Sequence, residues 1–395
     1  MAPTMMTIIF RLVPREKIGG GMGVFMIAML VAPAIGPTLG GYLVEYVSWR
    51  WIFTVNLPLG AIGLLLAVFV LPEIRSRDPG PFDVPGALAA AAGLFCLLLA
   101  VSKSSDWGWG SEPTVLLLAV SFFSFALFAV VELTTDRPLL DLRVFRHASF
   151  TMANLMIVVI SISMFSALFY IPLFLQRMRG LGAMQTGLLM LPASLAEAVA
   201  MPVVGRLYDR SGPRAIAVIG LLLMSAFNYL FHNLGMATAT STISLWLVLR
   251  GFFLPMAYNP AQISFLADIP AEQVGRATAI TNILGRVASS LGIAVMTSII
   301  TARQAVKAAH LAWSVSPDST AVVDLLGRMQ GLLGGGPAAQ GAALASLQAL
   351  AGRAAFVSAM DEMFIITSAL TLVGLVPAFF LKKSAAEKRT AAMDA

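Results

Sequence analysis

The sequence predicts an all-α polytopic membrane protein with about ten transmembrane helices. Hydrophobic residues make up 58% of the 395 residues, charged residues only 12%, and the mean hydropathy is +0.85. A soluble domain carries about 25% charged residues, so most of the surface of this chain would be apolar in water. The apolar residues also gather in runs long enough to cross a bilayer as helices, which takes about 20 residues each.

The predicted spans are bounded by charges, prolines or glycines. They cover approximately residues 18–43, 49–71, 84–102, 113–133, 149–174, 181–204, 213–232, 241–266, 273–301 and 358–381. One long extramembrane stretch, at about residues 302–356, separates the last two spans. Within it, Val322–Leu333 and Ala342–Leu350 are expected to form short amphipathic helices at the outer surface.

The distribution of lysine and arginine predicts the orientation of the chain. If Arg15 and Lys17 are cytoplasmic, 16 of the 26 basic residues lie inside, 8 lie outside, and Arg250 and Arg286 lie within spans. This bias predicts a multi-pass membrane protein with a cytoplasmic C-terminus. Because the basic residues are scattered, anionic lipid headgroups are their expected partners and nucleic acid is not.

The first predicted span contains a segment rich in glycine and proline. Gly36 and Gly40 stand four residues apart, so they share one helix face and let a neighbouring backbone approach closely. Pro33 and Pro37 remove backbone donors and kink the helix on that face. Together with Gly41 they could form a pivot between two helix bundles. Ordinary helix packing explains the same spacing, and the spacing alone does not decide between the two.

A charged segment between two later spans is flanked by glycines. Gly205 and Gly212 permit a tight turn, while Arg210 and Arg214 are placed at the cytoplasmic headgroups. Asp209 could face the positive N-terminal end of another helix and so latch two bundles together. An ordinary positive-inside loop would account for the basic residues, but not for Asp209 and the paired glycines.

Charged side chains within spans are costly, at least about 2.5 kcal/mol each on insertion scales, so they commonly serve a purpose. Glu197 lies eight residues before Gly205, about 12 Å into the bilayer at 1.5 Å per residue. It could bind a proton or a cationic drug, or pair structurally with a basic group. Arg250, at similar depth, could be that partner, bind substrate or organise its helix. Asn282 and Arg286 share one face and would line a cavity or a bundle interface.

Several of these segments resemble motifs of the major facilitator superfamily. Residues 32–41, followed by residues 49–60, look like its fifth-helix antiporter motif and the start of its sixth helix. The match is to the fourteen-helix drug:proton antiporters of the EmrB/QacA type, although Ala32 stands where the motif usually begins with glycine. Residues 137–145 resemble the link into the C-terminal bundle, and residues 205–214 resemble the second copy of the superfamily's loop motif. Further matches to its tenth and eleventh core helices are Arg250, Gly251, Pro260, Asn282 and Arg286.

The resemblance implies a major facilitator fold with a truncated N-terminal bundle. Residues 1–72 would be the remnant of that bundle, containing the end of helix four and helices five and six. Residues 73–148 would form two linking transmembrane helices, and residues 149–395 the C-terminal six-helix bundle with its extracytoplasmic loop at about 302–356. In this architecture Asp209 would meet the start of the first span, near Lys17–Gly20.

The resemblance also implies a secondary active transporter of the bacterial plasma or inner membrane. It would export hydrophobic or cationic drugs or toxic metabolites in exchange for protons, by alternating access, with the proton gradient as driving force and no cofactor. Besides the bilayer and the substrate, a periplasmic adaptor and an outer-membrane channel come into question as partners. Two other interpretations stay open: a truncated, transport-inactive fragment, and a non-transporting membrane partner or sensor.

Enzymatic and metal-dependent functions are not expected from the sequence. The three histidines, His147, His232 and His310, lie near different span ends without ligand spacing. No phosphate-binding loop, nucleophile elbow or zinc-binding helix motif is found in the sequence. The sequence therefore predicts a membrane transporter and no metal site.

Overall fold

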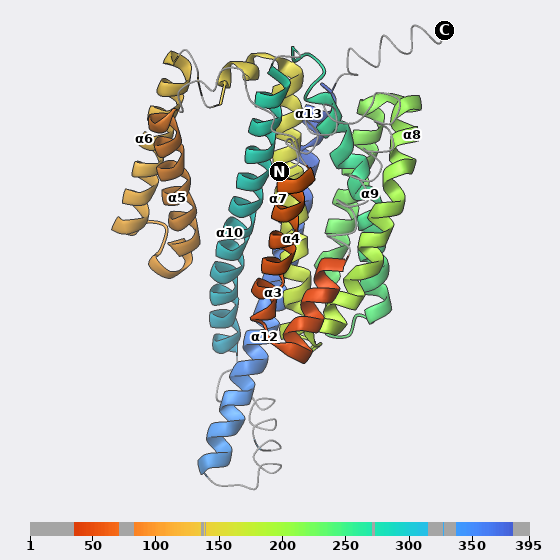
Figure 1. The fold of residues 1–395 in the computed structure, drawn as a ribbon. Helices are drawn as coiled ribbons and strands as arrows, with labels where there is room; N and C mark the ends of the chain where they lie inside the picture. The colour runs from red at the N-terminus through yellow and green to blue at the C-terminus, as the bar shows by residue number, and fades with distance from the viewer. Residues whose placement is uncertain are drawn as a thin grey trace.

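The computed structural model describes residues 35–70, 83–135, 138, 140–270, 273–314, 327 and 337–381, which form helices and short connections without any strand. The long helices lie side by side in a bundle (Figure 1). Three short helices are η2 (Leu43–Val47), η3 (Leu142–Arg146) and η4 (Phe231–Asn233). The α-helices are α3 (Trp51–Thr54), α4 (Asn56–Val70), α5 (Val84–Trp107), α6 (Glu112–Thr134), α7 (Ala148–Arg177), α8 (Ala183–Leu230), α9 (Thr240–Ser264), α10 (Val274–Ser314), α12 (Pro337–Val373) and α13 (Leu375–Ala378).

The predicted spans are recovered as helices. Eight stretches of the described chain are long and apolar enough to cross a membrane. One of them is α8, continued by η4, which holds two predicted spans joined at a kink, so nine of the ten predicted spans are accounted for. The remaining one, at 18–43, begins outside the described residues, and its last part, 35–42, is helical. The predicted all-α polytopic fold class is confirmed.

The bundle has two ends, which we name after the short helices found there. The η3 end, at the top of Figure 1, carries η3, the kink of α8 and the end of α13. The η4 end, at the bottom of the same view, carries η4, the turn between α7 and α8, and the start of α12. Figure 1 also shows the α5–α6 hairpin standing at one side of the bundle.

The predicted extramembrane stretch at 302–356 is helical at both flanks, because α10 continues to Ser314 and α12 begins at Pro337. Its location outside the membrane stays a prediction. Ala342–Leu350 is therefore a section of α12 and not a separate surface helix, and Val322–Leu333 lies outside the described residues apart from Gly327. The physical reason is that α12 contains no proline after its first residue and is rich in alanine, the best helix former. Figure 1 shows α12 projecting beyond the other helices at the η4 end.

Helix α9 packs backbone to backbone against both halves of α8. A Cβ added at Gly251 of α9 would lie 2.5 Å from the carbonyl oxygen of Ala193 in the first half. A Cβ added at Gly220 in the second half would lie 2.4 Å from the backbone of Met256 and Ala257 in α9. Small residues permit such an approach, which stabilises helix pairs in a bilayer through van der Waals contact.

The α5–α6 hairpin is attached to the bundle through α10. The Ser104 hydroxyl of α5 lies 3.1 Å from the Ser298 hydroxyl of α10, and Trp109 Nε1 donates to the same Ser298 oxygen at 3.2 Å. Within the hairpin, Gly93 makes room for the ring of Phe125, whose carbons would lie 3.2 Å from an added Cβ. The hydrogen bonds of Ser104 and Trp109 with Ser298 fix the side of the bundle on which the hairpin stands.

The kink in α8 depends on Gly212, whose φ of 77° and ψ of 171° are essentially restricted to glycine. We expect Gly212→Ala to lower the free energy of unfolding by about 1–3 kcal/mol, because alanine is strained in this conformation. Gly205→Ala is the matched control, since an added Cβ there meets nothing within 4 Å. Thermal unfolding in detergent measures both variants, and equal midpoints would contradict the requirement for glycine at 212.

Candidate functional site

Arg250 lies within α9 and is buried, with 7% of its surface exposed. Its Nε donates to Asn228 Oδ1 of α8 at 3.0 Å, and its Nη2 donates to the carbonyl oxygen of Ser163 in α7 at 3.3 Å. A buried guanidinium needs such acceptors, because a charge removed from water without partners is very costly. Arg250 therefore holds α7, α8 and α9 together.

The hydrogen bonds around Arg250 extend to a fourth helix. Asn228 Nδ2 donates to Ser163 Oγ at 2.7 Å and to Thr371 Oγ1 of α12 at 3.3 Å. Thr371 Oγ1 also lies 2.9 Å from Ser163 Oγ, within hydrogen-bond distance. Ser163, Asn228 and Thr371 are fully buried. We call these three residues with Arg250 the Arg250 network, which joins α7, α8, α9 and α12.

The sequence predicted Arg250 but missed its partners. Asn228 could have been recognised from the sequence, because an amide within an apolar run needs a hydrogen-bond partner in the bilayer. Ser163 and Thr371 could not, because a serine or threonine hydroxyl can bond to the backbone of its own helix, as Thr371 does to Thr367 at 2.7 Å. Which helices are neighbours cannot be read from such residues.

Glu197 lies in the first half of α8 and is half-buried. It interacts electrostatically with Arg250, so the structure brings together the two charges that the sequence placed at similar depth. Among the described residues, however, no ion pair within 4.0 Å and no hydrogen bond engages the Glu197 carboxylate, while Arg250 donates to the neutral oxygens of Asn228 and Ser163. The Glu197 carboxylate therefore interacts with the charge of Arg250 at a distance, without a direct contact.

Asn282 and Arg286 are exposed on α10. Asn282 Nδ2 donates to the carbonyl oxygen of Thr278, one turn earlier in the same helix, at 2.8 Å. In the part of the chain that the structure describes, no hydrogen bond or ion pair joins either residue to the Arg250 network. Their role in lining a cavity or a bundle interface stays a prediction.

The glycine-proline segment packs against the start of α8, at the η4 end. A Cβ added at Gly41 would lie 2.5 Å from the carbonyl oxygen of Ala183, and one added at Gly187 would lie 2.5 Å from the carbonyl oxygen of Pro37. Hydrogen bonds join the same two segments. Thr38 Oγ1 donates to the carbonyl oxygen of Gly187 at 3.2 Å.

Within the described residues, this contact lies on another face of the segment than the pair Gly36 and Gly40. Within the described residues, Cβ atoms added at Gly36 and Gly40 meet nothing within 4 Å, so the close approach occurs at Gly41 and not at the predicted pair. The reason is geometric, because successive residues of a helix lie about 100° apart and Gly41 therefore faces another direction than Gly40. Pro33 lies outside the described residues.

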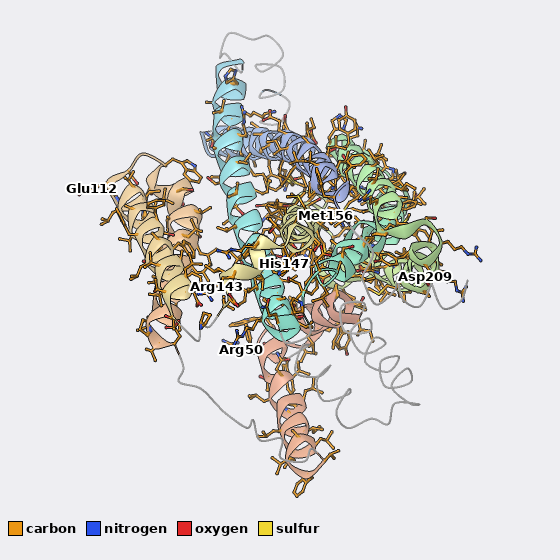
Figure 2. The ribbon with its side chains drawn as sticks, turned by 90° about the horizontal axis from the view of Figure 1, so that it is seen from above. Arg50, Glu112, Arg143, His147, Met156 and Asp209 are labelled. Atoms are coloured by element: carbon orange, nitrogen blue, oxygen red, sulfur yellow. The ribbon has the colours of Figure 1, made fainter. Side chains whose placement is uncertain are left out.

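The predicted loop at residues 205–214 is part of α8 and leaves helical geometry only at Gly212. Asp209 and Arg210 are exposed, and Figure 2 shows Asp209 at the outer edge of the bundle, on the opposite side from Glu112 of the α5–α6 hairpin. Lys17–Gly20 lies outside the described residues, so the latch by Asp209 stays a prediction. Sequence reasoning missed the contact of Arg214, whose Nε donates to the carbonyl oxygen of Leu381 at 2.8 Å.

In the described ranges of the chain, no group of three or more histidine, cysteine, aspartate or glutamate side chains could hold a metal ion. The lone cysteine, Cys96, is half-buried in α5 and forms no disulfide.

Known proteins share these features. Residues 1–293 match the Major Facilitator Superfamily. The chain belongs to this superfamily. Because its members are membrane transporters, the predicted classification as a transporter and not an enzyme is confirmed, and the chain is a multi-pass membrane protein in contact with lipid.

Two relatives and one solved structure illustrate the similarity. The chain is 33% identical to the uncharacterized MFS-type transporter YhcA of Bacillus subtilis, over 77% of this chain and 57% of that protein. It is 28% identical to the tetracenomycin C resistance and export protein of Streptomyces glaucescens, over 98% of this chain and 73% of that protein. Its fold resembles a bacterial homologue of the human lysosomal transporter Spinster in an inward-facing, occupied conformation, with a TM-score of 0.51, 13% identity and coverage of 95% and 72%.

These relatives confirm the predicted resemblance to drug-resistance members of the superfamily. The chain spans a little over half the length of YhcA, so the relatives contain residues that have no counterpart here. What the superfamily match establishes is the fold and the transporter class of this chain.

The contact between the glycine-proline segment and α8 can be tested by cross-linking. Glu45 Oε2 accepts a hydrogen bond from Met184 N at 2.8 Å. With Cys96→Ser as background, a short bifunctional thiol reagent should therefore link Glu45→Cys to Met184→Cys. We expect Gly41→Leu to reduce the yield on gels, because its side chain would overlap Ala183, and Gly36→Leu to leave it unchanged. Equal yields for both variants would show that Gly41 is not the contact.

The Arg250 network should be a major source of stability. We expect Arg250→Leu to lower the free energy of unfolding by about 1–3 kcal/mol or more, because Asn228 Oδ1 and the Ser163 carbonyl lose their donor in a buried site. Arg286→Leu, at an exposed position of α10, should change it by no more than about 0.5 kcal/mol. Unfolding in mixed micelles with a denaturing detergent measures both, and similar losses would argue against the network.

Proposed function

We propose that this chain forms part of a secondary active transporter that exports hydrophobic or cationic drugs or toxic metabolites in exchange for protons. The observation that carries the proposal is Glu197, a half-buried carboxylate in a membrane-spanning helix that no described residue pairs directly. Ionisable groups in such positions are expensive and commonly mark ion or substrate pathways.

The relatives support export as the direction of transport. The Streptomyces glaucescens protein is described as conferring resistance to tetracenomycin C and exporting it, and the similarity to it covers 98% of this chain. Carried over to this chain, export of a small toxic compound is the activity that agrees best with the superfamily match.

Glu197 and Arg250 together suggest how exchange would occur. A deprotonated Glu197 would attract a cationic or proton-donating substrate, and a proton arriving at the same carboxylate would remove that attraction and release the substrate. Arg250 is already bonded to Asn228 and Ser163, so it would set the local field without moving. One carboxylate would thus serve the proton and the substrate in turn.

Alternating access would arise from rocking of two bundles around this site. In the division that we propose, residues 1–72 belong to the N-terminal bundle, residues 73–148 form the linking helices, and residues 149–395 form the C-terminal bundle. The contact of Gly41 with the start of α8 joins the first of these parts to the third, as expected of a pivot.

The same proposal includes the orientation. The η3 end carries Arg143, Arg146, Arg214 and Arg276, and by the positive-inside rule these residues support a cytoplasmic location for this end and for the C-terminus in a bacterial plasma or inner membrane. The η4 end would then face outward. A periplasmic adaptor and an outer-membrane channel, if the protein uses them, would meet it at that end.

Efflux from vesicles tests the function. In vesicles that contain the full-length protein, an imposed proton gradient should drive efflux of a cationic dye. Glu197→Gln should abolish this gradient-driven efflux, because an amide side chain cannot exchange a proton. Glu112→Gln is the matched control, as Glu112 is an exposed carboxylate at the start of α6. Gradient-driven efflux that persists in Glu197→Gln would exclude Glu197 as the exchanging carboxylate.

A further inference from the structure

The short helix η3 carries arginines at the joint between the α5–α6 hairpin and the rest of the bundle. It connects α6 to α7, and Figure 2 shows Arg143 where the chain passes from one to the other. Arg143 and Arg146 of η3 and Arg276 in the first turn of α10 are all exposed. The three arginines therefore lie at the η3 end, on the side where the hairpin stands.

The three guanidinium groups come from two elements but belong to one place. Arg143 and Arg146 are three residues apart in η3, which is a 3₁₀-helix. Such a helix has three residues per turn, so side chains at this spacing lie one above the other on the same face. Arg276 is joined to the same helix, because its Nη1 lies 3.8 Å from Oδ2 of Asp141, the N-cap residue of η3.

Two carboxylates beside these arginines are buried and bonded within the joint. Glu132 Oε2 accepts a hydrogen bond from Leu140 N at 3.0 Å, and Asp141 Oδ1 accepts one from Arg143 N at 3.1 Å. Three arginines and two carboxylates leave a formal surplus of one positive charge. Because the carboxylates are buried and the guanidinium groups are exposed, this surplus faces the outside of the protein.

The guanidinium groups retain donors for a ligand. Each has five N–H donors. Within the described residues, Nη2 of Arg143 donates to the carbonyl oxygen of Leu133 at 3.1 Å, and Arg146 takes part in no hydrogen bond or ion pair. Planar guanidinium groups bind phosphate oxygens through paired hydrogen bonds, and a phosphodiester carries one negative charge. The group therefore matches a phosphodiester in both geometry and charge.

Apolar side chains of α6 adjoin the arginines on the membrane side. Leu133, whose carbonyl oxygen accepts from Arg143, is the next-to-last residue of α6 and has an exposed side chain. Val130 and Leu127 precede it at intervals of three residues and are exposed as well. Residues at this spacing are neighbours on a helix surface, so an apolar strip leads from the arginines into the membrane. A free phosphate would not contact this strip, whereas the acyl chain of a phospholipid would.

We propose that one anionic phospholipid binds at this joint, with its phosphate between Arg143, Arg146 and Arg276 and an acyl chain along the end of α6. This site differs from the general attraction of basic residues to anionic headgroups, because it requires guanidinium groups from two elements at one point. The bound phosphate links η3 to α10 and so strengthens the attachment of the hairpin to the bundle. Lipid binding does not depend on drug export, so its test and the efflux test can fail independently.

Native mass spectrometry of the purified protein in detergent tests the site. We expect one molecule of phosphatidylglycerol to bind more tightly than the neutral lipid phosphatidylcholine. Arg143→Gln with Arg146→Gln should weaken phosphatidylglycerol binding by about tenfold or more, because two positive charges beside the phosphate are lost. The matched control is Arg206→Gln with Arg210→Gln, which removes two exposed arginines near the kink of α8 at the same end and should leave this affinity unchanged.

Arg146→Gln alone separates lipid binding from folding. Its guanidinium has no hydrogen bond or ion pair within the described structure, whereas Arg143→Gln also removes the donor to the Leu133 carbonyl oxygen. We expect Arg146→Gln to weaken phosphatidylglycerol binding while the midpoint of thermal unfolding in lipid-free detergent stays that of the wild type.

Three results would overturn the proposal. Equal affinities of the wild type for phosphatidylglycerol and phosphatidylcholine would show that the site does not recognise charge. Equal losses in the two double variants would show a diffuse attraction by basic residues and no single site. Displacement of the lipid by millimolar inorganic phosphate would show that the arginines bind phosphate without any contribution from the acyl chain.

Discussion

The structure depends on the requirement that a guanidinium inside the bilayer be surrounded by acceptors. Arg250 donates hydrogen bonds to oxygens of Asn228 and Ser163 on two other helices. Asn228 and Ser163 are in turn within hydrogen-bond distance of Thr371 on a further helix. Because lipid supplies no competing hydrogen bonds, such a network determines which helices are neighbours even though apolar contact alone would tolerate other arrangements. The four helices of the C-terminal part are thereby specified relative to one another.

Close backbone packing adds a second constraint that acts at different points. Gly251 and Gly220 hold α9 against the two halves of α8, and Gly41 and Gly187 hold the glycine-proline segment against the start of α8. In each case the missing side chain is what allows contact, so the contact is lost with any larger residue. Hydrogen bonds between side chains determine which helices are neighbours, and glycines determine how closely the backbones of those helices approach.

Much of the fold could be predicted from the sequence, because lipid imposes length and apolarity on every span. The ends of α10 and α12 could not, since a helix does not have to stop where its apolar run stops. Glu197 and Arg250 were recognisable because charges in apolar runs are rare. Their surroundings were not recognisable, because the partners Ser163 and Thr371 are ordinary residues whose importance comes from tertiary packing. The choice of Gly41 over Gly36 and Gly40 likewise depends on which face meets α8.

The kink at Gly212 has a mechanical consequence. One residue reverses the chain between the two halves of α8, and both halves are clamped to α9 by glycine contacts. The two halves of α8 and α9, which are three successive membrane crossings, are therefore packed too closely to slide past one another. We therefore expect these three crossings to move together, and any relative motion within the protein to occur where other segments contact them.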